Sequence, residues 1–148
     1  MFRTGDAVGI DKIYLCGFSP TPLDRFGRVR RDMVKSALGA EKTVPWEYIK
    51  SASTLINKLK KEGYRIIGVE QDENSVNYRK IKAGNKNAII MGAEVTGIPK
   101  SILKKCDVIA EIPMRGKLAR NRLHDDVGKE SLNVSVACGV VLFQILKI

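Results

Sequence analysis

Four short apolar runs, separated by longer stretches of mixed character, constrain the fold of this 148-residue chain most strongly. The runs are KIYLCG at 12–17, YRIIGVEQ at 64–71, NAIIMG at 87–92 and DVIAEIP at 107–113. Short, continuous apolar runs are typical of strands that are covered on both faces of a parallel sheet. Because helical segments are expected between them, the pattern predicts an α/β domain with a mostly parallel sheet and flanking helices.

Two connecting segments have helical patterns. From Glu47 to Lys61 the apolar residues recur on one face, the lysines lie largely on the other, and Gly63 follows as a C-terminal glycine. Residues 99–105 predict a short helix entered through a proline. Near the start, FRTGDAVG at 2–9 is expected to be the last turn or two of a helix that closes at Gly5 or Gly9.

Length and cysteine content bound the class of protein. We expect a single domain over 1–148, because a chain of this length can bury a sizeable core. Cys16, Cys106 and Cys138 lie far apart, with neither CxxC nor Cys/His spacing, which indicates a reducing compartment and no metal site. The sequence shows no signal peptide, and its apolar stretch at 134–142 is too short to span a bilayer. We therefore expect a soluble, cytoplasmic protein that does not associate with a membrane.

The charge is strongly basic. Twenty-six lysines and arginines against sixteen acidic residues give a net charge of +10. Such an excess favours a polyanionic partner whose binding weakens with salt, although the same charges could simply keep the surface soluble. The basic residues cluster early, at Arg25, Arg28, Arg30, Arg31 and Lys35, and late, at Arg115, Lys117, Arg120 and Arg122. The early cluster follows a proline-containing loop at 19–27 and extends into a basic helical stretch.

The segment AEVTGIP, which follows the third apolar run, is the first candidate for a functional site. In parallel α/β sheets, ligands bind beyond the carboxyl ends of the strands. Here Glu94 stands between Gly92 and Gly97, so a ligand could approach the backbone while the carboxylate orients an amine or a hydroxyl. A glycine-bracketed turn with a solvated glutamate is the alternative. The segment has neither a P-loop nor a dinucleotide fingerprint.

Two further segments could belong to the same site. In DVIAEIPMRG, Ile112 and Met114 follow a strand and could form an apolar wall for a flat ring, or could simply pack in the core. In KESLNVSV, Ser131 and Asn133 stand where the last helix begins. Helix capping explains one of these polar residues, but it does not explain both.

These motifs, in the order FRTGDAVG, MGAEVTGIP, IPMRG and SLNVSVACGVV, resemble those of the SpoU (TrmH-like) family of the SPOUT superfamily. That family consists of RNA ribose 2′-O-methyltransferases, and the likeness spans essentially the whole chain. The resemblance implies an α/β domain whose C-terminal part is tied in a deep trefoil knot, an exception to the rule that chains do not thread loops. It also implies an enzyme that methylates tRNA or rRNA with S-adenosylmethionine (SAM) and without a metal.

The resemblance assigns roles to individual residues. Gly92, Ile112 and Leu132 would hold the adenosine of SAM, while Met114 and Gly97 would shape the pocket. Ser131, Asn133 and Glu94 would be active-site groups.

Arg3 matches the family's motif-one arginine. Because an arginine is normally too basic to accept a proton, we expect it to bind the phosphate next to the target ribose rather than to act as a base. A frayed terminal arginine is the alternative.

Family members are homodimers that pack the C-terminal helix near the interface. The small residues Ser135, Cys138 and Gly139 would permit close helix approach, either at that interface or within the subunit.

The chain departs from the family in two places. Relatives carry a strand and the first half of a helix before the equivalent of Arg3, so the chain is expected to be N-terminally truncated. Residues 117–128 look like an insertion, with Arg120, Arg122 and His124 in a polar loop. If the missing segment is essential, the alternative to an enzyme is a protein that binds SAM or RNA without turnover.

Overall fold

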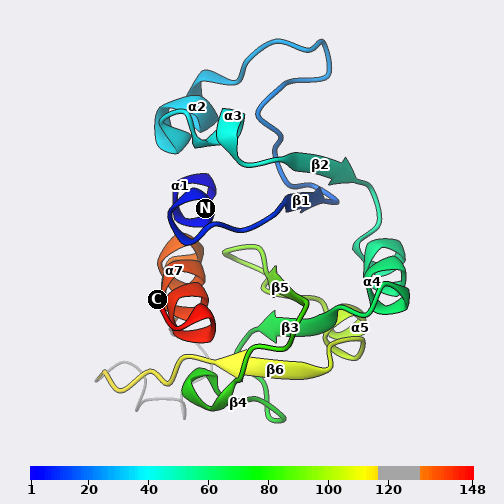
Figure 1. Ribbon diagram of the computed structural model, residues 1–148, viewed down its shortest axis with the longest axis vertical. Coiled ribbons are helices and arrows are strands. Elements are labelled where there is room, and N and C mark those ends of the chain that lie inside the picture. Colours follow the sequence, from blue (N-terminus) through cyan, green and yellow to red (C-terminus); the bar gives the residue numbers. More distant parts are fainter. Residues whose placement is uncertain (117–130) are drawn as a thin grey trace.

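The computed structural model describes residues 1–116 and 131–148. Figure 1 shows the elements in these two ranges. They are α1 (Phe2–Val8), β1 (Ile13–Cys16), α2 (Arg31–Ala37), α3 (Ala40–Thr43), β2 (Trp46–Ile49), α4 (Ala52–Lys61), β3 (Arg65–Val69), β4 (Val76–Asn77), the 3-10 helix η1 (Tyr78–Lys80), β5 (Asn87–Met91), α5 (Lys100–Leu103), β6 (Val108–Glu111) and α7 (Val134–Leu146).

All pairings between the named strands are parallel, and two isolated antiparallel bridges lie in loops of the described residues. One sheet has the order β4-β6-β3-β5, and β1 pairs with β2 in a second, two-stranded sheet. Ile67 of β3 pairs with Ile89 of β5 on one side and with Val108 of β6 on the other. The predicted α/β class with mostly parallel strands is therefore confirmed, and the four apolar runs form β1, β3, β5 and β6.

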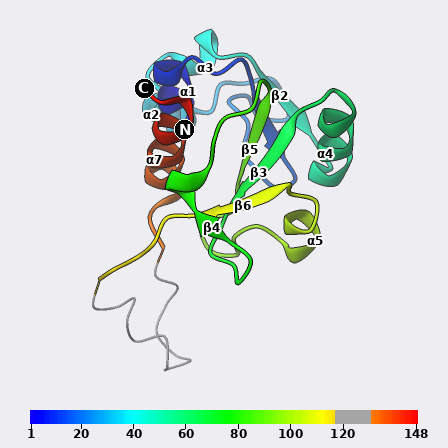
Figure 2. The ribbon, with the colours of Figure 1, turned by 60° about the horizontal axis from the view of Figure 1, so that its bottom comes forward.

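Helices cover both faces of the larger sheet. In Figures 1 and 2, α7 and α1 lie on one side of it, and α4 and α5 lie on the other. Neighbouring residues of β3 point to opposite faces: Ile66 packs with Leu55 and Leu59 of α4, whereas Ile67 packs with Val141 and Ile145 of α7. Burial on both faces explains why the strand is continuously apolar.

The predicted helix over 47–61 is wrong in its first turn. Residues 46–49 form β2, with Trp46 paired to Ile13 and Ile49 paired to Cys16. The helix begins later because Ser51 caps it, with its hydroxyl accepting a hydrogen bond from the N–H of Thr54 at 3.2 Å. Aromatic and β-branched residues directly after a proline favour a strand, and the pairing with β1 decides the outcome.

Helix α1 packs directly on α7. It ends at Gly9, which adopts a left-handed conformation with a φ of 67°, so of the two predicted ends Gly9 is confirmed. A Cβ placed on Gly139 would lie 3.6 Å from the side chain of Thr4, and Val8 shares a buried cluster with Cys138. Two of the small residues of α7 therefore serve packing within the chain.

Two predictions concern the connection between β6 and α7. The expected insertion at 117–128, with Arg120, Arg122 and His124, lies outside the described residues. The trefoil knot, which would involve this connection, stays a prediction. In the part of the chain that the structure describes, no helix is both long enough and apolar enough to cross a membrane.

Candidate active site

The loop at 92–98 follows β5 and is closed on itself. The N–H of Gly97 donates to the carbonyl of Ala93 at 2.8 Å, and Gly97 has a φ of 66°, which other residues rarely adopt. A Cβ on Gly92 would lie 2.6 Å from the backbone nitrogen of Ile98. Both glycines are therefore required by the shape of the loop, whether or not a ligand approaches it.

The carboxylate of Glu70, at the end of β3, holds this loop in place. Its Oε2 accepts a hydrogen bond from the N–H of Ile98 at 2.7 Å. Its Oε1 accepts one from the N–H of Gln71 at 3.1 Å. Glu70 was not among the predicted site residues, although an acidic residue at the carboxyl end of the apolar run 64–71 is a usable signal.

Asn133 joins the start of α7 to the loop at 92–98. Its Oδ1 accepts a hydrogen bond from the N–H of Ser135 at 2.9 Å and so caps the helix. Its Nδ2 donates to Oε1 of Glu94 at 3.2 Å. Both side chains are exposed, so the pair combines a carboxylate and an amide on the surface, where a hydroxyl could bind.

The remaining predicted residues lie in the segments that flank this pair. Ser131 is exposed and Leu132 is half-buried, directly before the cap of α7. Ile112 and Met114 are half-buried beyond the end of β6, and Ile112 packs against the core cluster that contains Val141. The structure thus confirms core packing for Ile112, and the partial exposure of all three apolar side chains leaves surface available to a ligand.

Arg3 lies on α1, which packs against α7, the helix that Asn133 begins. It is exposed on α1 and lines a small cavity of about 500 Å³ with Asp6, Leu38 and Thr43. Within residues 1–116 and 131–148 it forms no ion pair and no hydrogen bond with Glu94 or Asn133. Its guanidinium is therefore open to a phosphate, but the described contacts do not bring it to the pair.

The side chains of this candidate site are chemically suited to bind SAM. An adenine ring needs apolar contacts, which the partly exposed side chains of Ile112, Met114 and Leu132 supply from two segments. The polar parts of the molecule need hydrogen-bonding groups, which Glu94 and Asn133 supply. In the described residues, His, Cys, Asp and Glu side chains form no cluster that could hold a metal ion.

Two solved structures share this fold. The A. aeolicus TrmH/SpoU tRNA modifying enzyme has a TM-score of 0.77 and 25% identity, over 99% of this chain and 65% of that one. An AdoMet-bound rRNA methyltransferase from Sinorhizobium meliloti has a TM-score of 0.81 and 24% identity, over 99% of this chain and 49% of that one. These likenesses confirm the predicted SPOUT-type α/β fold.

Sequence comparison identifies the family. A Staphylococcus saprophyticus protein assigned to the TrmH family of tRNA/rRNA methyltransferases is 30% identical over 147 residues. The match covers 99% of this chain and 52% of that protein, so the chain spans about half the length of the curated relatives it matches. Residues 1–143 match the model of the SpoU rRNA Methylase family. Because that match covers nearly every residue, the chain belongs to the SpoU rRNA methylase family.

Proposed function

We propose that the chain is an RNA methyltransferase that transfers the methyl group of SAM to a ribose 2′-hydroxyl of tRNA or rRNA. The observation that carries this proposal is the hydrogen bond between Asn133 and Glu94, since it unites two separate motifs of the family in one polar group. Bound SAM would supply an electrophilic methyl group on a sulfonium. The protein then has to bind both reactants in line and to orient the attacking hydroxyl.

Each part of the candidate site has a distinct task in this proposal. Ile112, Met114 and Leu132 would contact the adenine ring of SAM, and the loop shaped by Gly92 and Gly97 would lie beside the cofactor. Glu94 accepts a hydrogen bond from the ribose hydroxyl and takes up its proton as the methyl group is transferred, and the amide of Asn133 keeps that carboxylate in position. Ser131, exposed two residues before Asn133, is a further hydrogen-bonding group for the substrate.

Arg3 binds the phosphate next to the target ribose. A guanidinium forms a bidentate contact with phosphate oxygens, and its high pKa makes it unsuitable as a proton acceptor. Because Arg3 has no ion-pair partner in the described part of the chain, it is free to make this contact.

Methyl transfer is tested with tritium-labelled SAM and unmodified tRNA or rRNA transcripts. A methylated 2′-hydroxyl protects the adjacent phosphodiester from alkali, so the label should appear in alkali-stable dinucleotides. Label in single nucleotides would instead show base methylation and would overturn the ribose assignment.

We expect Asn133→Asp, which keeps a capping oxygen but loses the amide donor, to reduce the rate of methyl transfer about 100-fold through misplacement of Glu94. Asn85→Asp, which makes the same change at an exposed asparagine outside the site, is the matched control.

Cofactor binding is measured separately, by calorimetric titration with S-adenosylhomocysteine. Binding without methyl transfer to any RNA would favour the alternative, a protein that binds SAM or RNA without turnover. The observation that favours this alternative is that no described ion pair or hydrogen bond joins Arg3 to Glu94 or Asn133. Failure of the unaltered chain to bind S-adenosylhomocysteine would remove the methyltransferase proposal for this chain.

The proposed assembly is a homodimer in the cytoplasm, formed through α7. Val136 and Phe143 are exposed on this helix, and Val140 between them is half-buried. Their spacing places them along one side of α7 as an apolar stripe. A partner subunit would bury this stripe, which packing within the chain leaves open.

A further inference from the structure

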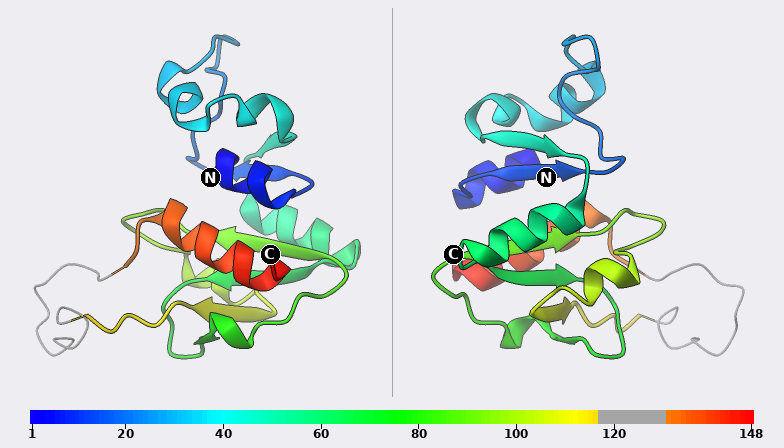
Figure 3. Two further views of the ribbon diagram at one scale, coloured as in Figure 1. Left: turned by 60° about the vertical axis from the view of Figure 1, so that its left-hand side comes forward. Right: turned by 90° about the vertical axis from the view of Figure 1, so that its right-hand side faces the viewer.

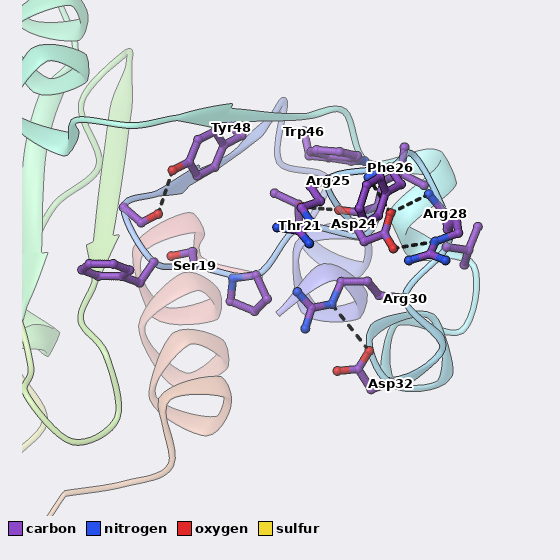
Figure 4. A pocket seen from close by; sticks show the side chains of 15 residues that line it. Ser19, Thr21, Asp24, Arg25, Phe26, Arg28, Arg30, Asp32, Trp46 and Tyr48 are labelled. Carbon is purple, nitrogen blue, oxygen red and sulfur yellow. Dashed lines mark hydrogen bonds and ion pairs between the residues drawn. The ribbon is translucent and has the colours of Figure 1, made fainter.

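The loop at 17–30, called here the Phe18 loop, is held in a defined shape by its own hydrogen bonds. Asp24 organises it: Oδ1 accepts from the N–H groups of Phe26 and Arg28 at 2.8 and 2.9 Å, and Oδ2 accepts from Nε of Arg28 at 2.9 Å. The hydroxyl of Tyr48 in β2 ties the start of the loop to the sheet by donating to the carbonyl of Gly17 at 2.8 Å. Figure 4 shows these contacts. A ligand that binds this loop therefore meets a preorganised surface.

Two phenylalanines of the Phe18 loop face solvent. Phe18 is fully exposed, and Phe26 is 65% exposed. Phe26 lies against the guanidinium groups of Arg25 and Arg28, at 4.7 and 4.9 Å from its ring centroid. Phe26 thus supports two arginines, whereas the ring of Phe18 is left open. Because Phe18 is fully exposed, its ring takes no part in packing within the described residues and is available to a ligand.

The charge around these rings is positive. Between residues 24 and 35 the chain carries five basic side chains and two acidic ones. Asp24 is engaged by Arg28, and Asp32 lies 3.9 Å from Arg30, which leaves Arg25, Arg31 and Lys35 outside the described ion pairs of this segment. An exposed ring and free cations in the same loop region suit a ligand with flat bases and anionic phosphates.

The Phe18 loop also borders an open groove of about 1120 Å³. Phe18, Pro20 and Phe26 line it from the loop, and Trp46 and Tyr48 line it from β2. In both views of Figure 3 the loop leaves β1 on the side of the molecule where α7 begins, which is also the side of Asn133. The groove is thus placed to hold nucleotides that flank a ribose bound at the Glu94–Asn133 pair.

We infer that the Phe18 loop binds an unpaired segment of the RNA substrate, with a base stacked on Phe18 and with a phosphate held by Arg25. This inference rests on the proposed function in taking RNA as the partner. The loop would select RNA whose bases are accessible, because a base inside a duplex cannot stack on a protein ring.

The test is fluorescence anisotropy with the complete 148-residue chain and two labelled probes, a 12-nucleotide oligouridylate and a blunt RNA duplex of the same length. Phe18→Ala and Phe18→Leu should each weaken binding of the single strand on the order of tenfold and leave duplex binding unchanged. Phe18→Tyr keeps the ring and should bind as the unaltered chain does. Since Phe18 is fully exposed, none of these variants should affect folding.

The arginines are tested through salt dependence. Arg25→Gln should reduce the slope of log K against log salt by about 0.7 for the single strand, because one phosphate contact is lost. Single-strand binding that is unaffected by Phe18→Ala would overturn the inference and leave the loop to another partner, such as a protein. Equal weakening for the single strand and the duplex would also overturn it.

Failure of the inference can be told from failure of the proposed function. If the unaltered chain binds S-adenosylhomocysteine and methylates RNA while the Phe18 variants bind both probes normally, only the proposed role of the Phe18 loop is refuted. Phe18-dependent binding of the single strand by a chain that does not bind S-adenosylhomocysteine would support the inference and remove the methyltransferase proposal. Absence of binding to either probe by the unaltered chain would overturn the inference.

Discussion

At the scale of single residues, Gly97 determines the shape of the candidate cofactor loop. Gly97→Ala would force a Cβ into a left-handed conformation and into contact with Oε2 of Glu70, which holds the N–H of Ile98. The strain alone costs about 1–2 kcal/mol, and displacement of Glu70 would open the loop. We expect a lower free energy of unfolding in urea and at least tenfold weaker S-adenosylhomocysteine binding, since 1.4 kcal/mol corresponds to tenfold.

Gly84→Ala is the matched control for that experiment. Gly84 has no positive φ, and an added Cβ would meet the Asn87 side chain at 3.5 Å, an ordinary contact. This variant should fold and bind as the unaltered chain does. Equal behaviour of the two alanine variants would show that the loop tolerates a side chain at Gly97 and does not need Glu70.

A second prediction at this scale concerns Asp107. The N–H of fully buried Ile66 donates to Oδ2 of Asp107 at 2.7 Å, and Lys60 lies 2.7 Å from Oδ1. These contacts hold the pKa of Asp107 below its usual range. Asp107→Ala should therefore cost about 1–3 kcal/mol at pH 7, because it leaves a buried N–H without an acceptor.

The pH dependence of that contribution follows from the direction of the shift. A carboxylate whose pKa is lowered by folding stabilises the protein above the pKa of the unfolded state, about 3.9, and this stabilisation is lost as the pH falls toward the folded pKa. Urea unfolding from pH 7 to pH 3 should thus show a constant difference between the unaltered chain and Asp107→Asn above about pH 5, and a shrinking one below about pH 4. A difference that grows on acidification would contradict this account.

At the scale of elements, Ser51 separates β2 from α4. Ser51→Ala removes the hydroxyl that accepts the Thr54 N–H and should lower the free energy of unfolding by about 1 kcal/mol. Ser53→Ala, inside the first turn, should be neutral or slightly stabilising because alanine favours helix. Thermal unfolding followed by circular dichroism distinguishes the two variants. Equal effects would argue for a helix that begins before Ser51.

The same boundary shows what sequence analysis could and could not provide. The runs that became β1, β3, β5 and β6 were predictable because burial on both faces leaves a continuous apolar signature. The strand β2 was not, because the apolar spacing of α4 extends back to Ile49 and only the pairing with β1 separates the two elements. The strand β4, with two residues, carries no periodic pattern.

The sequence predicted which residues belong to the candidate site, but it did not predict the contacts between them. The motifs identified Glu94 and Asn133 separately, yet their hydrogen bond joins residues 39 positions apart and depends on the complete fold. The position of Glu70 at the carboxyl end of a buried strand was a signal for a site, but nothing in its own segment reveals that it supports the loop after β5. Partners that come from a different strand are therefore the part of a site that a single sequence conceals.

At the scale of the whole molecule, the exposed stripe on α7 predicts a homodimer. Phe143 is 41% exposed, and α7 already buries Cys138, Val141, Leu142 and Ile145 within the chain, so its other side is left open. Phe143→Glu would place a charge in a dimer interface, where desolvation without a partner is costly. Light scattering coupled to size exclusion should give a dimer for the unaltered chain and a monomer for this variant, with unchanged helical circular dichroism.

The matched control for the dimer is Val76→Glu on β4, because Val76 is 39% exposed on an edge strand and is not part of the stripe on α7. This variant should remain dimeric, which separates an effect of the stripe from a general effect of added charge. An unaltered chain that stays monomeric at about 100 µM, a concentration at which even a micromolar interface would be filled, would contradict the dimer. The Glu94–Asn133 pair would then have to act within one subunit, since Asn133 begins the same helix that carries the stripe.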